Sequence, residues 1–130
     1  MTILKAFFNH KLYINVSENG ERIVLSKEKP EITRVFVPNH DGTELEVVTS
    51  DSPLTIEGEL NKVAANISIG RDWAGVHYYS DYRESMLLGE KVAIGMLVEQ
   101  AITYNPVEGF KMTLPKFDGS EITIPHAPIA

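Results

Sequence analysis

The apolar run between Asp81 and Tyr104 places the strongest constraint on the fold. Written as a helix, it carries large or small apolar side chains round almost its whole circumference: Leu87, Leu88, Val92, Ala93, Met96, Leu97, Val98, Ala101 and Ile102. A helix of this kind needs packing partners on several sides, so we expect it to be central. It should end at Asn105-Pro106, because proline cannot continue the helical hydrogen-bond ladder.

A first, amphipathic helix is predicted before it, from Thr55 to about Ile69. Its apolar residues recur at three- and four-residue spacing and form one stripe: Leu60, Val63, Ala64 and Ile67. Two helices offer too little cover for the apolar run that follows, and exposed apolar surface favours association. We therefore expect homo-oligomers, or association with further protein that covers the second helix.

The rest of the chain reads as extended or irregular. Residues 1–9 look like a helix end, and residues 10–54 look like a loop-rich insertion, with prolines, an Asp41-Gly42 turn and scattered β-branched residues. In the tail, residues 106–130, two extended runs flank Asp118-Gly119, which indicates a two-residue β-hairpin turn. The expected fold is thus a single mainly α domain over 1–130: a helical-bundle C-terminal portion, with the motif-bearing helix pair at 55–105, a loop-rich insertion and a terminal β-hairpin.

Composition limits the classes of function. The net charge of −6, from 12 basic and 18 acidic residues, argues against binding to nucleic acid or to an anionic membrane surface. Cysteine is absent, so disulfides and thiolate metal sites are excluded, and the four histidines, His10, His40, His77 and His126, lie too far apart in sequence to support a zinc site. The longest apolar run, 92–98, is far shorter than the roughly 20 residues that a membrane span requires. The sequence does not indicate a cellular compartment.

The chemistry is concentrated in the segment that joins the two helices. Arg71, His77 and Asp81 place a permanent cation, an imidazole and a carboxylate in one short stretch. Arginine presents a planar fork of donors that matches the oxygens of phosphate or vanadate. Histidine can attack phosphorus or ligate a metal through one ring nitrogen while a carboxylate holds the other. The pattern is typical of one wall of a site for a tetrahedral oxyanion.

Spacing decides whether the three side chains can meet. Arg71 and His77 lie about 240° apart round a continuous helix, so they converge only if the chain breaks between them, and Gly75 supplies the place. His77 and Asp81 share one face of a local helix. Asp81 would then accept the Nδ1 proton of His77 and leave the lone pair of Nε2 facing outward.

Each residue also has a purely structural interpretation. Asp81 with Glu84 three residues later is a helix-capping pattern, and Arg71 beside Asp72 could be a surface ion pair of little energy. An isolated histidine is usually a half-buried polar residue. The joint spacing of the three favours the site.

The run Arg71, five residues, His77, three residues, Asp81 resembles the third signature block of the superfamily of vanadium-dependent haloperoxidases and type 2 phosphatidic acid phosphatases. The wider segments 58–77 and 88–95, with Ser80-Asp81 between them, are similar to the haloperoxidase branch. The resemblance implies that Arg71 hydrogen-bonds the equatorial oxygens of the oxyanion and that His77 is the axial ligand of vanadate, or the nucleophile in a phosphatase. Asp81 would orient His77. Gly70 stands where the family block often has serine.

Two earlier family blocks, one with a lysine and an arginine and one with Ser-Gly-His, do not occur in the chain. The opening residues 2–9 resemble the end of the helix that follows the Ser-Gly-His block. The sequence is therefore expected to be the C-terminal piece of a longer protein, truncated, with a weak or inactive site on its own. In that interpretation the association expected above would be with a missing N-terminal half.

Three functions follow from these observations. The first is a haloperoxidase-like enzyme that oxidises halide with hydrogen peroxide on a vanadate bound to His77. The second is an acid phosphatase of the same superfamily, in which His77 accepts the phosphoryl group of a phosphate ester. The third is a noncatalytic remnant or interaction module.

Overall fold

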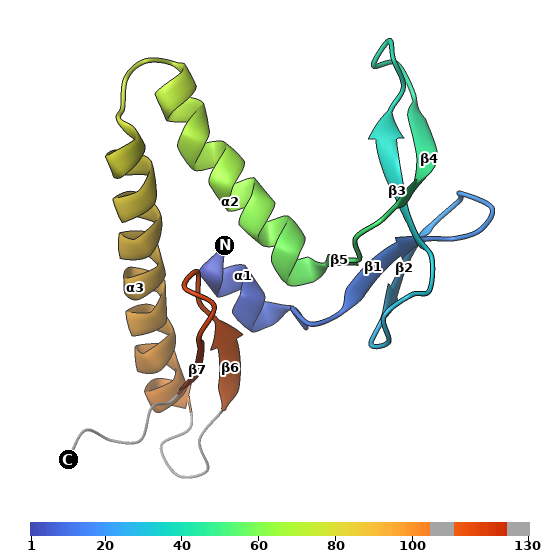
Figure 1. Cartoon of the computed structure of the whole chain (residues 1–130). Coiled ribbons are helices and arrows are strands. Elements are labelled where there is room, and N and C mark those ends of the chain that lie inside the picture. The colour runs from blue at the N-terminus through green and yellow to red at the C-terminus, as the bar shows by residue number, and fades with distance from the viewer. Residues whose placement is uncertain (105–110, 125–130) are drawn as a thin grey trace. The chain divides into compact units, whose positions relative to one another are not determined.

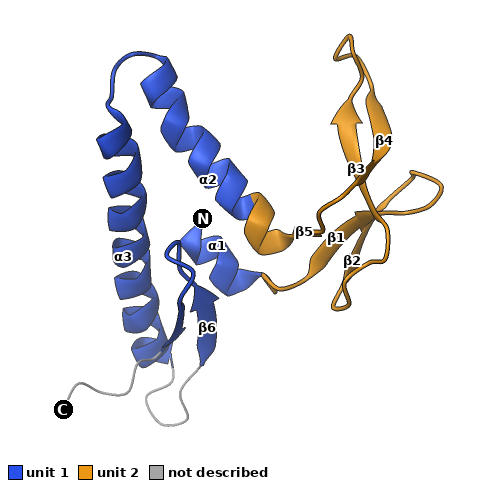
Figure 2. Ribbon diagram, viewed as in Figure 1, with its two compact units in different colours: residues 1–8, 60–130 blue, residues 9–59 orange. Residues whose placement is uncertain are grey.

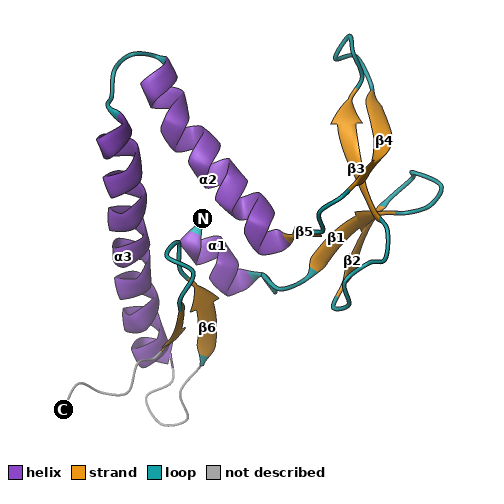
Figure 3. Cartoon of the chain, in the orientation of Figure 1, coloured by secondary structure: helices purple, strands orange, loops and turns teal. Residues whose placement is uncertain are grey.

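The structure is a computed structural model that describes residues 1–104 and 111–124 (Figure 1). The chain divides into two compact units, residues 1–8 with 60–130 and residues 9–59 (Figure 2). Of the described residues, 42% are helical and 25% lie in strands (Figure 3). The expectation of a mainly α helical bundle is therefore wrong, because the chain is mixed, with several antiparallel sheets beside its helices.

The unit formed by residues 9–59 accounts for most of this difference. It contains β1 (Tyr13–Val16), β2 (Ile23–Ser26), β3 (Thr33–Pro38), β4 (Leu45–Ser50) and β5 (Leu54–Thr55). Strands β2, β1 and β5 form one antiparallel sheet in that order, and β3 pairs with β4. The loop-rich insertion predicted for residues 10–54 is thus a set of short paired strands, since the β-branched residues scattered along it favour extended backbone.

One side chain ties β1 to the start of β3. The Nδ2 amide of Asn15 donates to the carbonyl of Ile32 at 2.9 Å. Its Oδ1 accepts the backbone N–H of Arg34 at 2.6 Å. A single amide thus satisfies two backbone groups of the other strand pair.

The other unit is built round α3 (Tyr79–Tyr104), with α1 (Thr2–Phe7), β6 (Met112–Pro115) and β7 (Glu121–Ile124). The buried residues of α3 fall on one face: Glu90, Ala93, Leu97 and Ala101. Leu97 and Ala101 pack with Leu114 and Ile124 of the strands to form the core cluster. Other apolar residues of α3, such as Leu88, Val92 and Met96, are more than half exposed, at 63%, 55% and 53%.

Within the described residues, α3 is therefore not covered on all sides, as the sequence predicts it should be. The helix buries one face against α1 and the strands, and the apolar residues on its other side stay more than half exposed. Self-association stays a prediction.

The terminal hairpin predicted about Asp118-Gly119 is present. β6 and β7 pair antiparallel from Met112 opposite Ile124 to Pro115 opposite Glu121. The backbone N–H of Lys116 donates to the carbonyl of Ser120 at 2.8 Å, and that of Gly119 donates back to Lys116 at 3.1 Å, with Gly119 at φ 82°. The loop is therefore a three-residue turn closed by a left-handed glycine, not a two-residue one. The predicted helix stop at Asn105-Pro106 lies outside the described residues.

Two buried charged side chains fasten this hairpin to the helices. Nζ of Lys5, which is 1% exposed, donates to the carbonyl of Pro115 at 3.4 Å and lies 4.7 Å from the centre of the Phe117 ring. Glu90 of α3 accepts the backbone N–H of Phe117 at 2.7 Å. Each contact compensates a polar group removed from water.

Helix α2 (Ile56–Trp73) begins at Thr55, whose hydroxyl accepts the backbone N–H of Gly58 at 3.1 Å as a helix N-cap does. The helix runs four residues beyond Ile69, the predicted end. No residue of α2 is buried, so the predicted apolar stripe does not form a core, and Ile67 is 65% exposed. No helix in residues 1–104 or 111–124 is long and apolar enough to cross a bilayer.

Candidate oxyanion site

The end of α2 turns the chain toward α3 at Gly75, as the sequence predicts. Gly75 adopts φ 71°, a left-handed conformation that side chains with a Cβ rarely adopt. Its N–H donates to the carbonyl of Asp72 at 2.9 Å, and the N–H of Val76 reaches back to the carbonyl of Arg71 at 3.4 Å. These two bonds form a Schellman motif. Arg71 therefore lies in the last turn of α2, and His77 lies beyond the turn.

A concavity of about 260 Å³ lies where α2, this connection and α3 meet. Its walls combine charged and hydroxyl-bearing side chains from both helices with the imidazole between them: Ile67, Ser68, Arg71, Asp72, His77, Asp81, Tyr82 and Ser85. The three residues that the sequence singled out, Arg71, His77 and Asp81, all line it. Their chemical roles stay predictions.

His77 and Asp81 are the two members of the predicted set that touch. Nδ1 of His77 lies 3.4 Å from Oδ2 of Asp81, and the side chains are 43% and 48% exposed. A carboxylate at this nitrogen favours the tautomer with the proton on Nδ1. Nε2 then keeps its lone pair and is free to meet a ligand.

Asp81 also serves the helix. Its Oδ2 accepts the backbone N–H of Tyr78 at 3.1 Å, the residue just before α3. Asp81 is therefore the third residue of the helix, and its carboxylate reaches back to the N-cap position, as an acidic residue does in a capping box. One carboxylate thus makes the contacts that both interpretations require, with the N–H of Tyr78 and with Nδ1 of His77, although Asp81 is not itself the N-cap.

Asp72 is the site residue that sequence reasoning missed. The sequence suggests only a surface ion pair between Asp72 and Arg71, and among the described residues no ion pair joins the two. Its Oδ1 is instead buried without a hydrogen-bond partner. The predicted end of the helix at Ile69 is too early. Because α2 continues to Trp73, Ser68, Arg71 and Asp72 lie on successive turns of one helix and all line the concavity.

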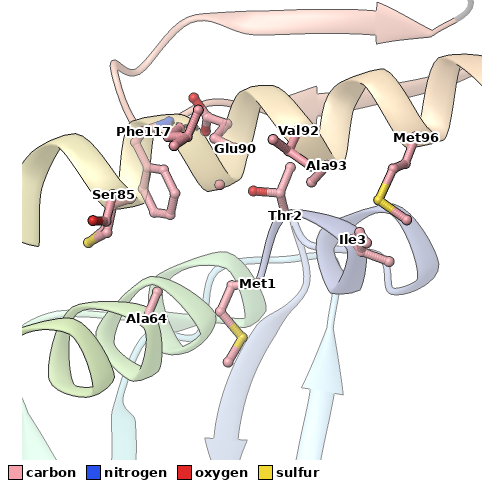
Figure 4. A pocket seen from close by; sticks show the side chains of 13 residues that line it. Met1, Thr2, Ile3, Ala64, Ser85, Glu90, Val92, Ala93, Met96 and Phe117 are labelled. Carbon is pink, nitrogen blue, oxygen red and sulfur yellow. Dashed lines mark hydrogen bonds between the residues drawn. The ribbon is translucent and has the colours of Figure 1, made fainter.

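A second, apolar pocket of about 580 Å³ lies beside α3, lined by α1, α3, Ala64 of α2 and the hairpin loop. Figure 4 shows Met1, Thr2 and Ile3 on one side of it and Val92, Ala93 and Met96 on the other. Ser85 lines both this pocket and the smaller concavity. The carboxylate of Glu90 lines this apolar pocket, but it is buried and accepts the backbone N–H of Phe117. The candidate site is therefore placed in the smaller concavity.

Comparison with known proteins supports the expected relation to the haloperoxidases. No protein-family model matches the chain. It is 47% identical over 124 residues, 95% of the chain, to the vanadium-dependent bromoperoxidase of Corallina pilulifera, and 46% identical over the same length to that of Corallina officinalis. It is 36% identical over 87 residues, 67% of the chain, to the vanadium-dependent bromoperoxidase of Ascophyllum nodosum.

The chain spans 17% of the length of the two Corallina proteins and 15% of the Ascophyllum protein. Over that segment it is related to the vanadium-dependent haloperoxidases.

Proposed function

We propose that this relative of the vanadium-dependent bromoperoxidases carries one wall of a haloperoxidase site, with Arg71 and His77 facing the oxyanion and Asp81 orienting His77. The observation that carries the proposal is that one concavity is lined by all three side chains. They come from α2, the connection and α3, and the turn at Gly75 brings them to it.

The donors present fit one edge of vanadate. The guanidinium of Arg71 offers two parallel N–H groups to two oxygens, and Nε2 of His77 offers a lone pair. Asp81 holds the proton of His77 on Nδ1, so the ring meets the anion in the correct tautomer. Vanadate, when bound, supplies the centre at which hydrogen peroxide is activated.

The overall reaction would be a two-electron oxidation. Halide and hydrogen peroxide, with one proton, give hypohalous acid and water, so the halide is oxidised and the peroxide reduced. Binding a multiply charged anion in competition with water takes more than one cation, and the concavity holds one arginine against two carboxylates. We therefore propose that further cationic donors come from outside these residues, and that the site is weak in the chain alone.

A chimera tests the proposal. The matching segment of the Corallina pilulifera bromoperoxidase is replaced by this chain, and vanadate-dependent bromination of a phenol indicator is measured, after circular dichroism shows that the chimera is folded. We expect activity, and its loss in His77→Ala. The conservative variant Asp81→Asn should retain more of it than His77→Ala, because the asparagine oxygen still accepts the Nδ1 proton.

Two outcomes contradict the proposal. A folded chimera with the same activity in His77→Ala removes that residue from the mechanism. A folded chimera with no activity at all favours the noncatalytic module.

A phosphatase is the second candidate, because the same lone pair on Nε2 of His77 could attack a phosphate ester. A P–N bond would form as the ester P–O bond breaks, and the leaving oxygen would take a proton. Acid-labile phosphate on His77 after incubation with a phosphomonoester would favour this candidate.

A further inference from the structure

Strand β2 is the outer strand of its sheet. Among the described residues it pairs only with β1, from Val16 opposite Ile23 to Tyr13 opposite Ser26. The backbone N–H and C=O groups along such an edge can bind a further strand. The three apolar residues 23–25 of β2 are also exposed, so both the backbone and the side chains of this edge are accessible to a partner.

The hydrogen bonds to β1 show which residues of β2 present their backbone groups at the outer edge. The N–H of Ser17 donates to the carbonyl of Arg22 at 2.9 Å, so the backbone groups of Arg22 face β1. Backbone groups alternate in direction along a strand. Those of Val24 therefore also face β1, and those of Ile23 and Leu25 face outward.

The sequence of this edge is complementary to itself when it is read in reverse. If a second copy runs antiparallel with its Val24 opposite Val24, Ile23 lies opposite Leu25 of that copy. The flanking residues Glu21 and Lys27 then also lie opposite each other. Each of these pairs occurs twice, because the arrangement has two-fold symmetry. Opposite charges and apolar side chains in facing positions both favour pairing.

The same register suits the backbone. In an antiparallel pair, residues that exchange hydrogen bonds alternate with residues that do not. The outward-facing residues Ile23 and Leu25 lie opposite each other and can exchange both bonds. Val24, whose backbone groups are directed to β1, lies at the position that needs none.

The edge of β4 lacks this complementarity. Within the described residues β4 pairs only with β3, and it also carries exposed apolar side chains. Residues 41–52, which contain β4, include four acidic residues and neither lysine nor arginine: Asp41, Glu44, Glu46 and Asp51. Two copies joined there would bring acidic side chains together without a cation. Charge complementarity therefore favours β2 as the edge that joins a second copy.

We propose that β2 is a contact between two copies of this chain, which join their β2 strands antiparallel about a two-fold axis at Val24. The strand has four residues, so the contact forms few backbone hydrogen bonds and is weak in the isolated chain. It does not depend on the proposed function. β2 belongs to the unit of residues 9–59, and the residues that line the concavity belong to the other unit.

A disulfide trap tests the contact. The chain has no cysteine, so Val24→Cys introduces a single thiol. In the proposed register the Cα atoms of the two copies of this position lie about 4.5 Å apart, within the range that a disulfide spans. Val48→Cys in β4 is the matched control, because Val24 and Val48 are 38% and 37% exposed.

Both cysteine variants of the full chain are oxidised mildly at about 0.1 mM, after circular dichroism shows that they are folded. We expect covalent dimers to form at least about tenfold faster from Val24→Cys than from Val48→Cys, because strand pairing raises the local concentration of the thiols. Electrophoresis without reductant measures both rates.

Charge exchange tests the register. Adding Lys27→Glu to the Val24→Cys chain sets two carboxylates opposite each other, so cross-linking should slow to the rate of the Val48→Cys control. Adding Glu21→Lys as well exchanges the two charges and should restore the rate. If Val24→Cys does not fold, sedimentation equilibrium of the otherwise unmodified chain with the same charge variants repeats the test.

Each contrary result overturns the proposal. Equal rates from the two cysteine variants would show that copies of the chain meet without a preferred edge. A rate that Lys27→Glu leaves unchanged, or that the double exchange does not restore, would show that Glu21 and Lys27 do not face each other. Neither result bears on Arg71 or His77, so the proposed function is tested separately.

Discussion

Oδ2 of Asp81 lies 3.4 Å from Nδ1 of His77, and the same oxygen accepts the N–H of Tyr78 at 3.1 Å. One carboxylate therefore contacts both the first turn of α3 and the imidazole. The position of His77 in the concavity depends on where the helix starts. Changes at Asp81 are expected to affect both.

Replacing Asp81 with Ala should destabilise the chain by about 1 kcal/mol, since the first turn of α3 loses its side-chain acceptor. It should also raise the fraction of His77 that carries its proton on Nε2. Urea unfolding measures the first effect and the ring nitrogen shifts of His77 measure the second. Asp81→Asn, which keeps an acceptor oxygen, should show less of both; identical ring shifts in all three proteins would mean that Asp81 does not orient His77.

Gly75 is expected to be essential to the turn. A Cβ at its φ of 71° costs roughly 1–2 kcal/mol, so Gly75→Ala should lower the midpoint of thermal unfolding and shift the resonances of His77. Gly70→Ala is the matched control. It lies within α2 with no heavy atom within 4 Å of an added Cβ, so it should stabilise the chain by about 0.5–1 kcal/mol. Equal effects of the two substitutions would contradict the role assigned to the turn.

The hairpin should depend on Glu90. Glu90→Ala leaves the backbone N–H of Phe117 without its acceptor at a partly buried position, at a cost of about 1–3 kcal/mol. Glu90→Gln keeps an acceptor oxygen and should lose less. Denaturant unfolding ranks the variants, and hydrogen exchange at the Phe117 amide shows whether the bond is the cause; unchanged exchange in Glu90→Ala would show that it is not.

Asp118 gives the hairpin a dependence on pH. The hydroxyl and backbone N–H of Ser120, together with Lys116, hold the pKa of Asp118 well below its usual value of 3.8. A carboxyl whose pKa is lowered by folding stabilises the folded state above its unfolded pKa, and this contribution is lost as the pH falls through the folded pKa. Asp118 should therefore remain ionised at about pH 3, as its carboxyl carbon shift in an NMR titration would show. A midpoint at the ordinary value would contradict the contacts with Ser120.

Local chemistry was predictable from the sequence, and the packing of long segments was not. The turn at Gly75, the pairing of His77 with Asp81 and the terminal hairpin follow from glycine conformation, helical spacing and turn residues. The sheets of residues 9–59 escaped prediction because their short strands lack a regular alternation of apolar and polar residues. The stripe on α2 was misread, since periodicity shows which residues share a face and not whether another element covers it.

Asp72 shows the same limit within the site. Its carboxyl resembles any surface acid in the sequence, and only the end of α2 decides that one of its oxygens loses contact with water. Burial of a single atom is set by packing, which a pattern of residue types does not encode.

Arg71 and His77 are proposed to face one bound oxyanion. Titration of the chain with vanadate, followed by the nitrogen shifts of the His77 ring, tests it most directly, with Asp118→Asn as a control outside the concavity. We expect saturable binding that weakens at least about tenfold in Arg71→Ala and in His77→Ala, and no change in the control. Binding to the His77 variant is followed through the vanadium signal. Equal affinity for vanadate in the unmodified chain and in both variants would contradict it.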